Sequence, residues 1–379
     1  MLLKQRFIIY LLAIYFGLVL FNTTYLGLGT YIPLIIMILG LMTILIGRSY
    51  RFEHFKLYYI MMGLIILISS LFSDADNFRN VFKILLTIIF FCFASSLKTT
   101  TREIRFLSLS ICCTYVIYVF LMIEAIGTDV VNYGRIDIRL FGGEIPIDTN
   151  VISAVYVLPF IISLYNLLYG QYKLLACCFI FFFIIGVLLS GSHGAAFSIG
   201  CSSICLLIPY LHSKKSSKFF KIISLGLVGL ALYYGFSYIS LQEDVMGAER
   251  IFDFNGDVSN GRIDIWEERL SLFLDSPLLG YGYNYNIGIN HYGTANHNLL
   301  LQILLFSGMI GLILFVIPTL KIFQKHSVSI SLKLALFISV FMPLFFIDSL
   351  EERTLWNFLI FYCLLSSHNN ANRYLLWNK

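Results

Sequence analysis

The chain has 379 residues, of which 59% are hydrophobic and only 12% are charged, and its mean hydropathy is +0.84. This composition excludes a water-soluble globular domain as the class of the protein. The formal net charge of +5 gives no argument for binding nucleic acid, because most basic residues fall in short connections between apolar segments.

Apolar runs long enough to cross about 30 Å of hydrocarbon as α-helices recur along the whole chain. The runs are continuous rather than alternating, which favours helices over a β-barrel. The sequence therefore predicts an all-α, polytopic integral membrane protein, a single membrane domain over 1–379 with about twelve transmembrane helices. The predicted helices cover residues 7–27, 31–47, 57–73, 81–97, 106–126, 150–170, 174–191, 194–212, 220–240, 298–320, 330–348 and 353–368.

The first apolar segment follows Lys4 and Arg6, as a secretory signal would. It is too long for a signal and has no clean cleavage site, so we expect it to remain as the first transmembrane helix. If the N-terminus is cytoplasmic, 18 of the 26 basic residues fall on the cytoplasmic side, as the positive-inside rule requires. The sequence thus predicts a multi-pass protein with both termini in the cytoplasm.

All eight cysteines fall inside predicted helices, where thiols behave as small apolar side chains. The sequence has no Cys-x-x-Cys pair and no Cys/His cluster, so it gives no support for a metal site. It also lacks a P-loop and a glycine-rich dinucleotide turn, which argues against ATP-driven transport and nucleotide chemistry. No metal and no cofactor is predicted.

Two connections are long, and both are predicted on the extracytoplasmic side: a shorter loop at 127–149 and a large loop at 241–297, before the tenth helix. A compact protein seldom keeps a loop of that length without a use for it. Within the large loop, the segment GRIDIWEERLSLFLDSP predicts a helix that ends before Pro277.

The apolar residues of this helix recur at spacings of three and four, which predicts an amphipathic helix lying along the membrane interface. They are Ile263, Trp266, Leu270 and Phe273. Arg262 and Arg269 lie seven residues apart on another face, so we expect their guanidinium groups at headgroup level.

His297 stands between Asn296 and Asn298, where the large loop ends and the tenth helix begins. The positive end of the helix dipole disfavours the protonated imidazole there, which leaves it available as a base near neutral pH. The alternative is a polar residue that merely anchors the helix at the membrane edge, and position alone favours that alternative.

Four arginines lie in the two long loops: Arg135, Arg139, Arg250 and Arg262. A guanidinium binds phosphate in a bidentate fork and cannot lose its charge, which suits a lipid-linked phosphate or diphosphate. Ordinary ion pairs with the many acidic residues nearby are the alternative.

Three stretches have a recognisable pattern. His297 and Asn298 are followed, after nine residues, by Gly308 and Gly311, which is similar to a pattern H-[NSQ]-x9-G-x-x-G. GRIDIW and SPLLGYG are similar to a GR-x-x-x-W segment and a P-x-x-G-x-G turn, and RLFGGEIPIDTNVISA is similar to an Arg, Gly and Pro-x-Asn run that opens a span. With the predicted architecture, these stretches resemble the O-antigen polymerase and O-antigen ligase family of bacterial envelope assembly.

One position departs from that family, which often has an S-R-G-A turn between two central spans. Here the turn is LSGSHGA, with His193 in place of the arginine. Two alternatives stay open: a protonated His193 binds phosphate, or another arginine has taken over the role.

The resemblance implies a glycosyltransferase of the bacterial inner membrane, acting without a metal on the periplasmic face with an undecaprenyl-diphosphate-linked glycan as donor. It implies His297 as the catalytic base. The candidate diphosphate-binding residues are Arg139, Arg262, Arg135, Arg250 and His193. The supporting residues are Asn298, Gly308, Gly311 and Trp266. A chain-length regulator and a flippase of the same pathway are the implied protein partners, and nucleic acid is not one.

A polymerase that joins lipid-linked repeat units into O-antigen is the favoured function. A ligase that transfers polymer to lipid A-core shares the donor and the motif, and only the replaced arginine and the sparse outer loops favour the polymerase. A flippase for the same lipid-linked oligosaccharide is the alternative from another class, but it should show internal repeats and ionisable groups near mid-membrane, and no repeat is found.

Overall fold

The described residues of the computed structural model are almost entirely helical. They are 2–18, 31–47, 52–73, 78–126, 131–132, 135–136, 149–212, 262–283, 298–325, 327–345, 347, 350, 353–368 and 375–377. Within them, β1 (Val131–Asn132) and β2 (Arg135–Ile136) form a short antiparallel pair. The predicted segment 220–240 and most of the two long loops lie outside the described residues.

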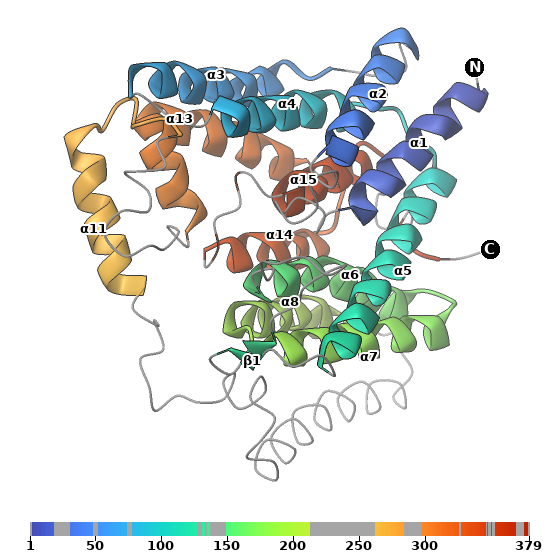
Figure 1. Cartoon of the computed structure of the whole chain (residues 1–379). Helices are drawn as coiled ribbons and strands as arrows, with labels where there is room; N and C mark the ends of the chain where they lie inside the picture. The colour runs from blue at the N-terminus through green and yellow to red at the C-terminus, as the bar shows by residue number, and fades with distance from the viewer. Residues whose placement is uncertain are drawn as a thin grey trace. The chain divides into compact units, whose positions relative to one another are not determined.

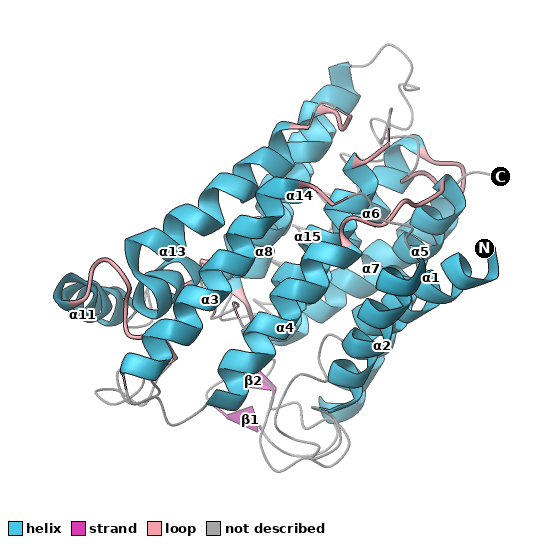
Figure 2. Cartoon of the chain, turned by 90° about the horizontal axis from the view of Figure 1, so that it is seen from above, coloured by secondary structure: helices cyan, strands magenta, loops and turns pink. Residues whose placement is uncertain are grey.

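Helices occupy all the remaining predicted apolar segments (Figures 1 and 2). They are α1 (Leu2–Gly17), α2 (Tyr31–Gly47), α3 (Leu57–Phe72) preceded by the 3-10 turn η2 (His54–Lys56), α4 (Phe78–Ala94), α5 (Thr101–Ile126), α6 (Thr149–Tyr169), α7 (Lys173–Ser190), α8 (His193–His212), α13 (Leu299–Gln324), α14 (Ile330–Leu344) and α15 (Arg353–Ser366). Within the described residues, six helical stretches are long and apolar enough to cross a membrane. The helical membrane architecture is thus confirmed, while the count of twelve stays a prediction.

The chain divides into two compact units. The first comprises Met1–Ile111, Ser259–Val328 and Leu344–Leu375, and the second comprises Cys112–Val258, Ser329–Pro343 and Leu376–Lys379. The first unit therefore joins the N-terminal helices to the segment that carries the His297 motif.

The centre of the first unit is α15, whose residues are buried along almost its whole length. A helix that is apolar on all sides needs neighbours on all sides. The indole of Trp356 lies 6.0 Å from the ring of Tyr59 and 5.3 Å from that of Phe91, centroid to centroid. The Tyr59 hydroxyl is 2.7 Å from the Thr319 hydroxyl, so the only polar atom of this aromatic ring is satisfied on α13.

In the second unit, α6 packs against both α7 and α8. Tyr156 on α6 stacks on Phe183 of α7, with the ring centroids 6.2 Å apart. The end of the chain docks on the same helices, because the Trp377 amide donates to the Asn166 side-chain oxygen at 2.7 Å and the Trp377 ring meets Phe179.

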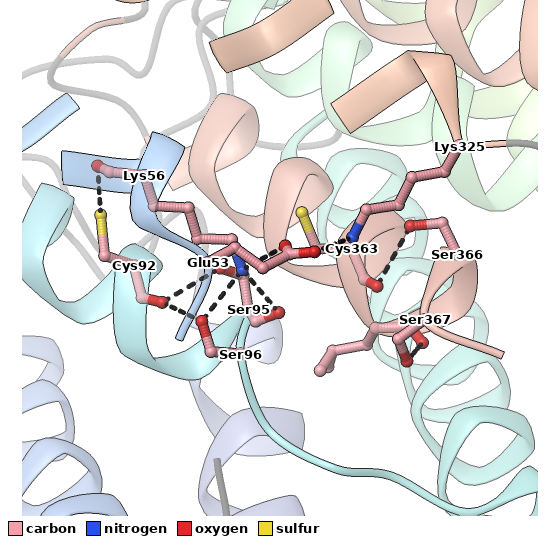
Figure 3. A network of polar contacts seen from close by, with 10 residues as sticks. Glu53, Lys56, Cys92, Ser95, Ser96, Lys325, Cys363, Ser366 and Ser367 are labelled. Carbon is pink, nitrogen blue, oxygen red and sulfur yellow. Dashed lines mark hydrogen bonds and ion pairs between the residues drawn. The ribbon is translucent and has the colours of Figure 1, made fainter. Parts of the chain in front are cut away.

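A buried lysine links three helices of the first unit (Figure 3). Lys56 is fully buried, and its Nζ donates to the Ser95 carbonyl and the Ser96 hydroxyl, both at 3.0 Å. Glu53 lies 3.4 Å from this Nζ and pairs at 2.7 Å with Lys325, which follows α13. The network therefore ties the start of α3 to the ends of α4 and α13.

Glu53→Gln should weaken this network. Burial alone would raise the pKa of the Glu53 carboxyl, but the hydrogen bond from Lys325 and the charges of Lys56 and Lys325 outweigh it and lower the pKa. Because the pKa is lowered in the folded state, this stabilisation is complete above the ordinary carboxylate pKa and is lost as pH falls through the lowered value. We expect the variant to lose about 1–2 kcal/mol at pH 7.

Thermal unfolding in detergent measures this loss, with the exposed Glu267→Gln on the helix at 262–275 as the matched control. The difference between Glu53→Gln and the wild type should shrink in strongly acidic buffer. Equal unfolding midpoints at pH 7 would contradict a stabilising role for the network.

Candidate functional site

The predicted helix in the large loop is present as α11 (Arg262–Asp275), and Pro277 follows its end as expected. It packs against α13 in the first unit. Its buried residues are Ile265, Arg269 and Phe273, which recur every four positions and therefore share one side of the helix.

Two residues of the predicted apolar stripe, Ile263 and Leu270, are 54% and 48% exposed, whereas Phe273 is buried. Arg269 was expected at headgroup level, but it is only 1% exposed, and its Nη1 lies 3.7 Å from a Glu268 oxygen. The reason is that packing against α13 selects the buried side, and the aliphatic stem of an arginine can occupy such a position.

The helix predicted from residue 298 is present as α13, which begins at Leu299. Asn298 has an extended backbone, and its side-chain oxygen accepts hydrogen bonds from the amides of Leu300 (2.9 Å) and Leu301 (3.2 Å). It is thus the N-cap of α13, a position where Asn and Ser are favoured. The residue that follows His297 in the chain therefore has a structural task of its own.

A break at Gly308 divides α13 into two parts, residues 299–307 and 309–324, which run in different directions (Figure 1). Gly308 has φ 62° and ψ −166°, a combination that is open in practice only to glycine. Gly308 and Gly311 therefore do not share one face of a continuous helix, because the helix does not continue through Gly308.

The turn at 276–282 fills this break, and four backbone hydrogen bonds join the two segments. They run from Tyr281 N to Leu305 O (2.6 Å), Gly282 N to Phe306 O (3.1 Å), Met309 N to Pro277 O (2.8 Å) and Ile310 N to Leu278 O (3.4 Å). A break inside an apolar segment exposes backbone groups that lipid cannot satisfy, and protein must then supply the partners. The P-x-x-G-x-G turn and the G-x-x-G end of the histidine motif thus form one structural unit.

Two glycines allow this close approach. A Cβ atom on Gly308 would overlap the carbonyl group of Leu278, and one on Gly280 would lie 2.8 Å from the Gly308 nitrogen. Gly280 also has a positive φ of 65°. The atoms that an added Cβ would meet at both glycines belong to the main chain, so they cannot move aside as a side chain could.

The structure describes some of the candidate diphosphate-binding residues but not the candidate base. His297, Arg139 and Arg250 lie outside the described residues. Arg262 begins α11 and so belongs, with Asn298 and the turn, to the first unit.

Two further candidates belong to the second unit, and for them, as for Arg262, the structure describes the backbone. Arg135 lies in β2, and His193 begins α8, two residues after the Gly191 cap of α7. β2 lies against α7. Of the predicted cations, Arg262 thus belongs to the first unit, and Arg135 and His193 belong to the second.

The sequence predicted no role for three side chains of α3 and α4 that, in addition to α13, bond to the turn. Ser69 and Ser70 of α3 and Asn80 of α4 bond to residues 279 and 283. No local pattern announces them, because about two hundred residues separate them from the turn in the sequence. Trp266 is partly buried, and its indole N–H has no hydrogen-bond partner among the described residues.

Residues 177–316 match the family model described as O-antigen ligase. The match begins within α7 and ends within α13, so it includes α11, the turn and the break. Among curated proteins, no sequence matches the chain. Members of the matched family are glycosyltransferase-like enzymes. The chain is therefore a helical membrane protein whose residues 177–316 are similar to the O-antigen ligase family.

Proposed function

We propose that the protein is an O-antigen polymerase, which joins undecaprenyl-diphosphate-linked oligosaccharide repeat units on the periplasmic face of the bacterial inner membrane. The observation that carries glycosyl transfer, which a polymerase and a ligase share, is the family match over 177–316. The direct bonding of its two glycine motifs supports it, because the histidine motif then lies on a helix that the turn holds in place.

The proposed reaction is a displacement at the anomeric carbon of the donor glycan. The acceptor hydroxyl oxygen bonds to this carbon, the bond to the diphosphate oxygen breaks, and the hydroxyl proton passes to His297. Undecaprenyl diphosphate leaves with the electron pair. It is a good leaving group, so the enzyme mainly needs a base for the acceptor and cations for the developing negative charge. The proposed reaction therefore uses neither a metal nor a cofactor.

The cations proposed for the leaving diphosphate come from both long loops and from one interhelical turn. They are Arg139, Arg262, Arg135, Arg250 and His193. A guanidinium keeps its charge throughout the reaction and binds phosphate oxygens in pairs, which a lysine cannot do.

The proposed location at the membrane surface agrees with the sides of α11. Ile263, Leu270 and Leu274 are exposed and fall on one edge of this helix, beside the exposed acidic residues Asp264 and Glu267. Such a surface suits the boundary between acyl chains and water. A helix there would hold Arg262 at the depth of a lipid-linked diphosphate.

The O-antigen ligase is the second candidate, and the description of the matching family favours it directly. Both enzymes would use the same donor and the same base. His193, in place of the family's usual arginine, and the sparse outer loops favour the polymerase. A chain-length regulator and a flippase of the pathway are the proposed partners of either enzyme.

A deletion strain tests the proposal. For a polymerase, loss of the chain should leave lipid A-core carrying at most a single repeat unit, and a plasmid copy should restore the full ladder on gels. Long chains that accumulate on the lipid carrier but never reach lipid A would show the ligase instead. Repeat units that stay on the cytoplasmic leaflet would show the flippase.

A further inference from the structure

We propose that two serines of α3, Ser69 and Ser70, are positioning residues for the glycosyl transfer, although α3 lies outside the family-matched segment. They would act through the turn at 276–283, which bonds to the part of α13 before Gly308, residues 299–307. This inference rests on the proposed function, since the transfer rate is its readout.

The two serines bond to the residues that flank Gly280 and Gly282 in the turn. The Ser69 hydroxyl donates to the Leu279 carbonyl at 2.7 Å, and the Ser70 hydroxyl accepts from the Tyr283 amide at 2.7 Å. The Ser70 hydroxyl also donates to the Ile66 carbonyl at 2.6 Å, so both its donor and its acceptor functions are used. Ser69 is 4% exposed and Ser70 is fully buried, which makes these bonds costly to lose.

The turn also rests directly on this part of α3. A Cβ atom on Gly282 would overlap the backbone of Ser70, so the two main chains are in contact. The Tyr283 hydroxyl accepts from the Asn80 amide of α4 at 2.9 Å, and its ring lies 5.2 Å from that of Phe306, centroid to centroid. The contacts therefore run from α3 and α4, through the turn, to residues 299–307 of α13.

The break at Gly308 makes these contacts necessary. In a continuous helix, each turn fixes the direction of the next. In α13, the non-helical residue Gly308 separates residues 299–307 from residues 309–324. The direction of residues 299–307 must then be set by the segments that pack against them. Because the turn bonds to both parts of α13, the serines that hold the turn also set the direction of residues 299–307 and of their N-cap Asn298, which directly follows the proposed base in the sequence.

A merely structural role for the serines would lower the stability of the protein without changing the chemical step in the molecules that remain folded. A positioning role predicts a fall in kcat with little change in KM, because a displacement of about 1 Å of a reacting group can cost about a hundredfold in rate. The two roles are therefore separable by kinetics.

The experiment uses the purified full-length protein in lipid vesicles, with the lipid-linked repeat unit extracted from the deletion strain as the probe. We expect Ser70→Ala and Ser69→Ala each to lower kcat by about 10- to 100-fold and to change KM by less than about twofold. The control is Ser339→Ala on α14, a fully buried serine whose hydroxyl donates to the carbonyl of Leu336 on its own helix. It should keep kcat within about twofold of the wild type.

Two further measurements keep the test decisive. Hydrogen exchange at the amides of Tyr281, Gly282, Met309 and Ile310 should accelerate in the alanine variants, and Ser69→Thr, which retains the hydroxyl, should recover most of kcat. If Ser70→Ala does not accumulate, Ser69→Ala decides, because it removes the single bond to Leu279.

An unchanged kcat in the variants that accumulate would overturn the positioning role, as would unchanged exchange at these amides. The proposed function has a separate failure. If the wild type itself forms no glycosidic bond, that function is lost, whereas an active wild type with fully active serine variants refutes the positioning role alone.

Discussion

Gly308→Ala is expected to abolish polymer synthesis and to lower the stability of the folded protein by at least about 2 kcal/mol. The backbone at this residue has φ 62° and ψ −166°, which side-chain-bearing residues almost never adopt. In addition, the new methyl group would overlap the Leu278 carbonyl, a backbone group that is itself bonded to the Ile310 amide. The turn would have to leave the break, and four backbone hydrogen bonds would be weakened together.

Thermal unfolding in detergent and polysaccharide gels measure the two effects of Gly308→Ala. The matched control is Gly200→Ala on α8, where an added Cβ atom would have no neighbour within 4 Å. That control should be neutral or more stable by about 0.5–1 kcal/mol, because alanine is the better helix former. Similar unfolding midpoints for Gly308→Ala and the wild type, with a normal polymer ladder, would contradict the assigned role of the break.

Hydropathy predicted the positions of the helices well, because the need to satisfy backbone groups in lipid leaves few alternatives to a continuous apolar helix. The predicted segment 31–47 coincides with α2, and 194–212 differs from α8 by one residue. The helix before Pro277 was also predictable, since proline and the preceding charged and apolar periodicity mark its end locally.

The orientation of α11 and the break in α13 were harder to predict. Periodicity shows that a helix has several sides, but it does not show which side meets a neighbour, and α11 buries Arg269 rather than Leu270. The glycines of both motifs were visible in the sequence. Their meaning was not, because the φ of Gly308 follows from the turn that enters beside it, from a segment about thirty residues away.

Long-range polar contacts left no local signal at all. No sequence pattern distinguishes Lys56 from the other basic residues, yet it is fully buried among the ends of α3, α4 and α13. Ser69 and Ser70 look like ordinary small residues at the end of an apolar helix. Their role depends on which segment packs beside them, and that is a property of the fold.

His297→Ala should reduce glycosyl transfer by about 10²- to 10⁴-fold, the usual contribution of a positioned general base. This histidine directly precedes Asn298, the N-cap of α13, in the sequence. The variant should insert and unfold as the wild type does, since the cap and the turn are unchanged. His291→Ala, a second histidine of the same loop, is the matched control and should retain full activity.

The most direct measurement is the reaction of purified protein in vesicles with the lipid-linked repeat unit of its host. The wild type should extend the glycan and release undecaprenyl diphosphate in equal amounts, and His297→Ala should do neither at a measurable rate. If the variant forms glycosidic bonds as fast as the wild type, His297 is not the base. If the wild type releases no undecaprenyl diphosphate, the protein is not the transferase proposed.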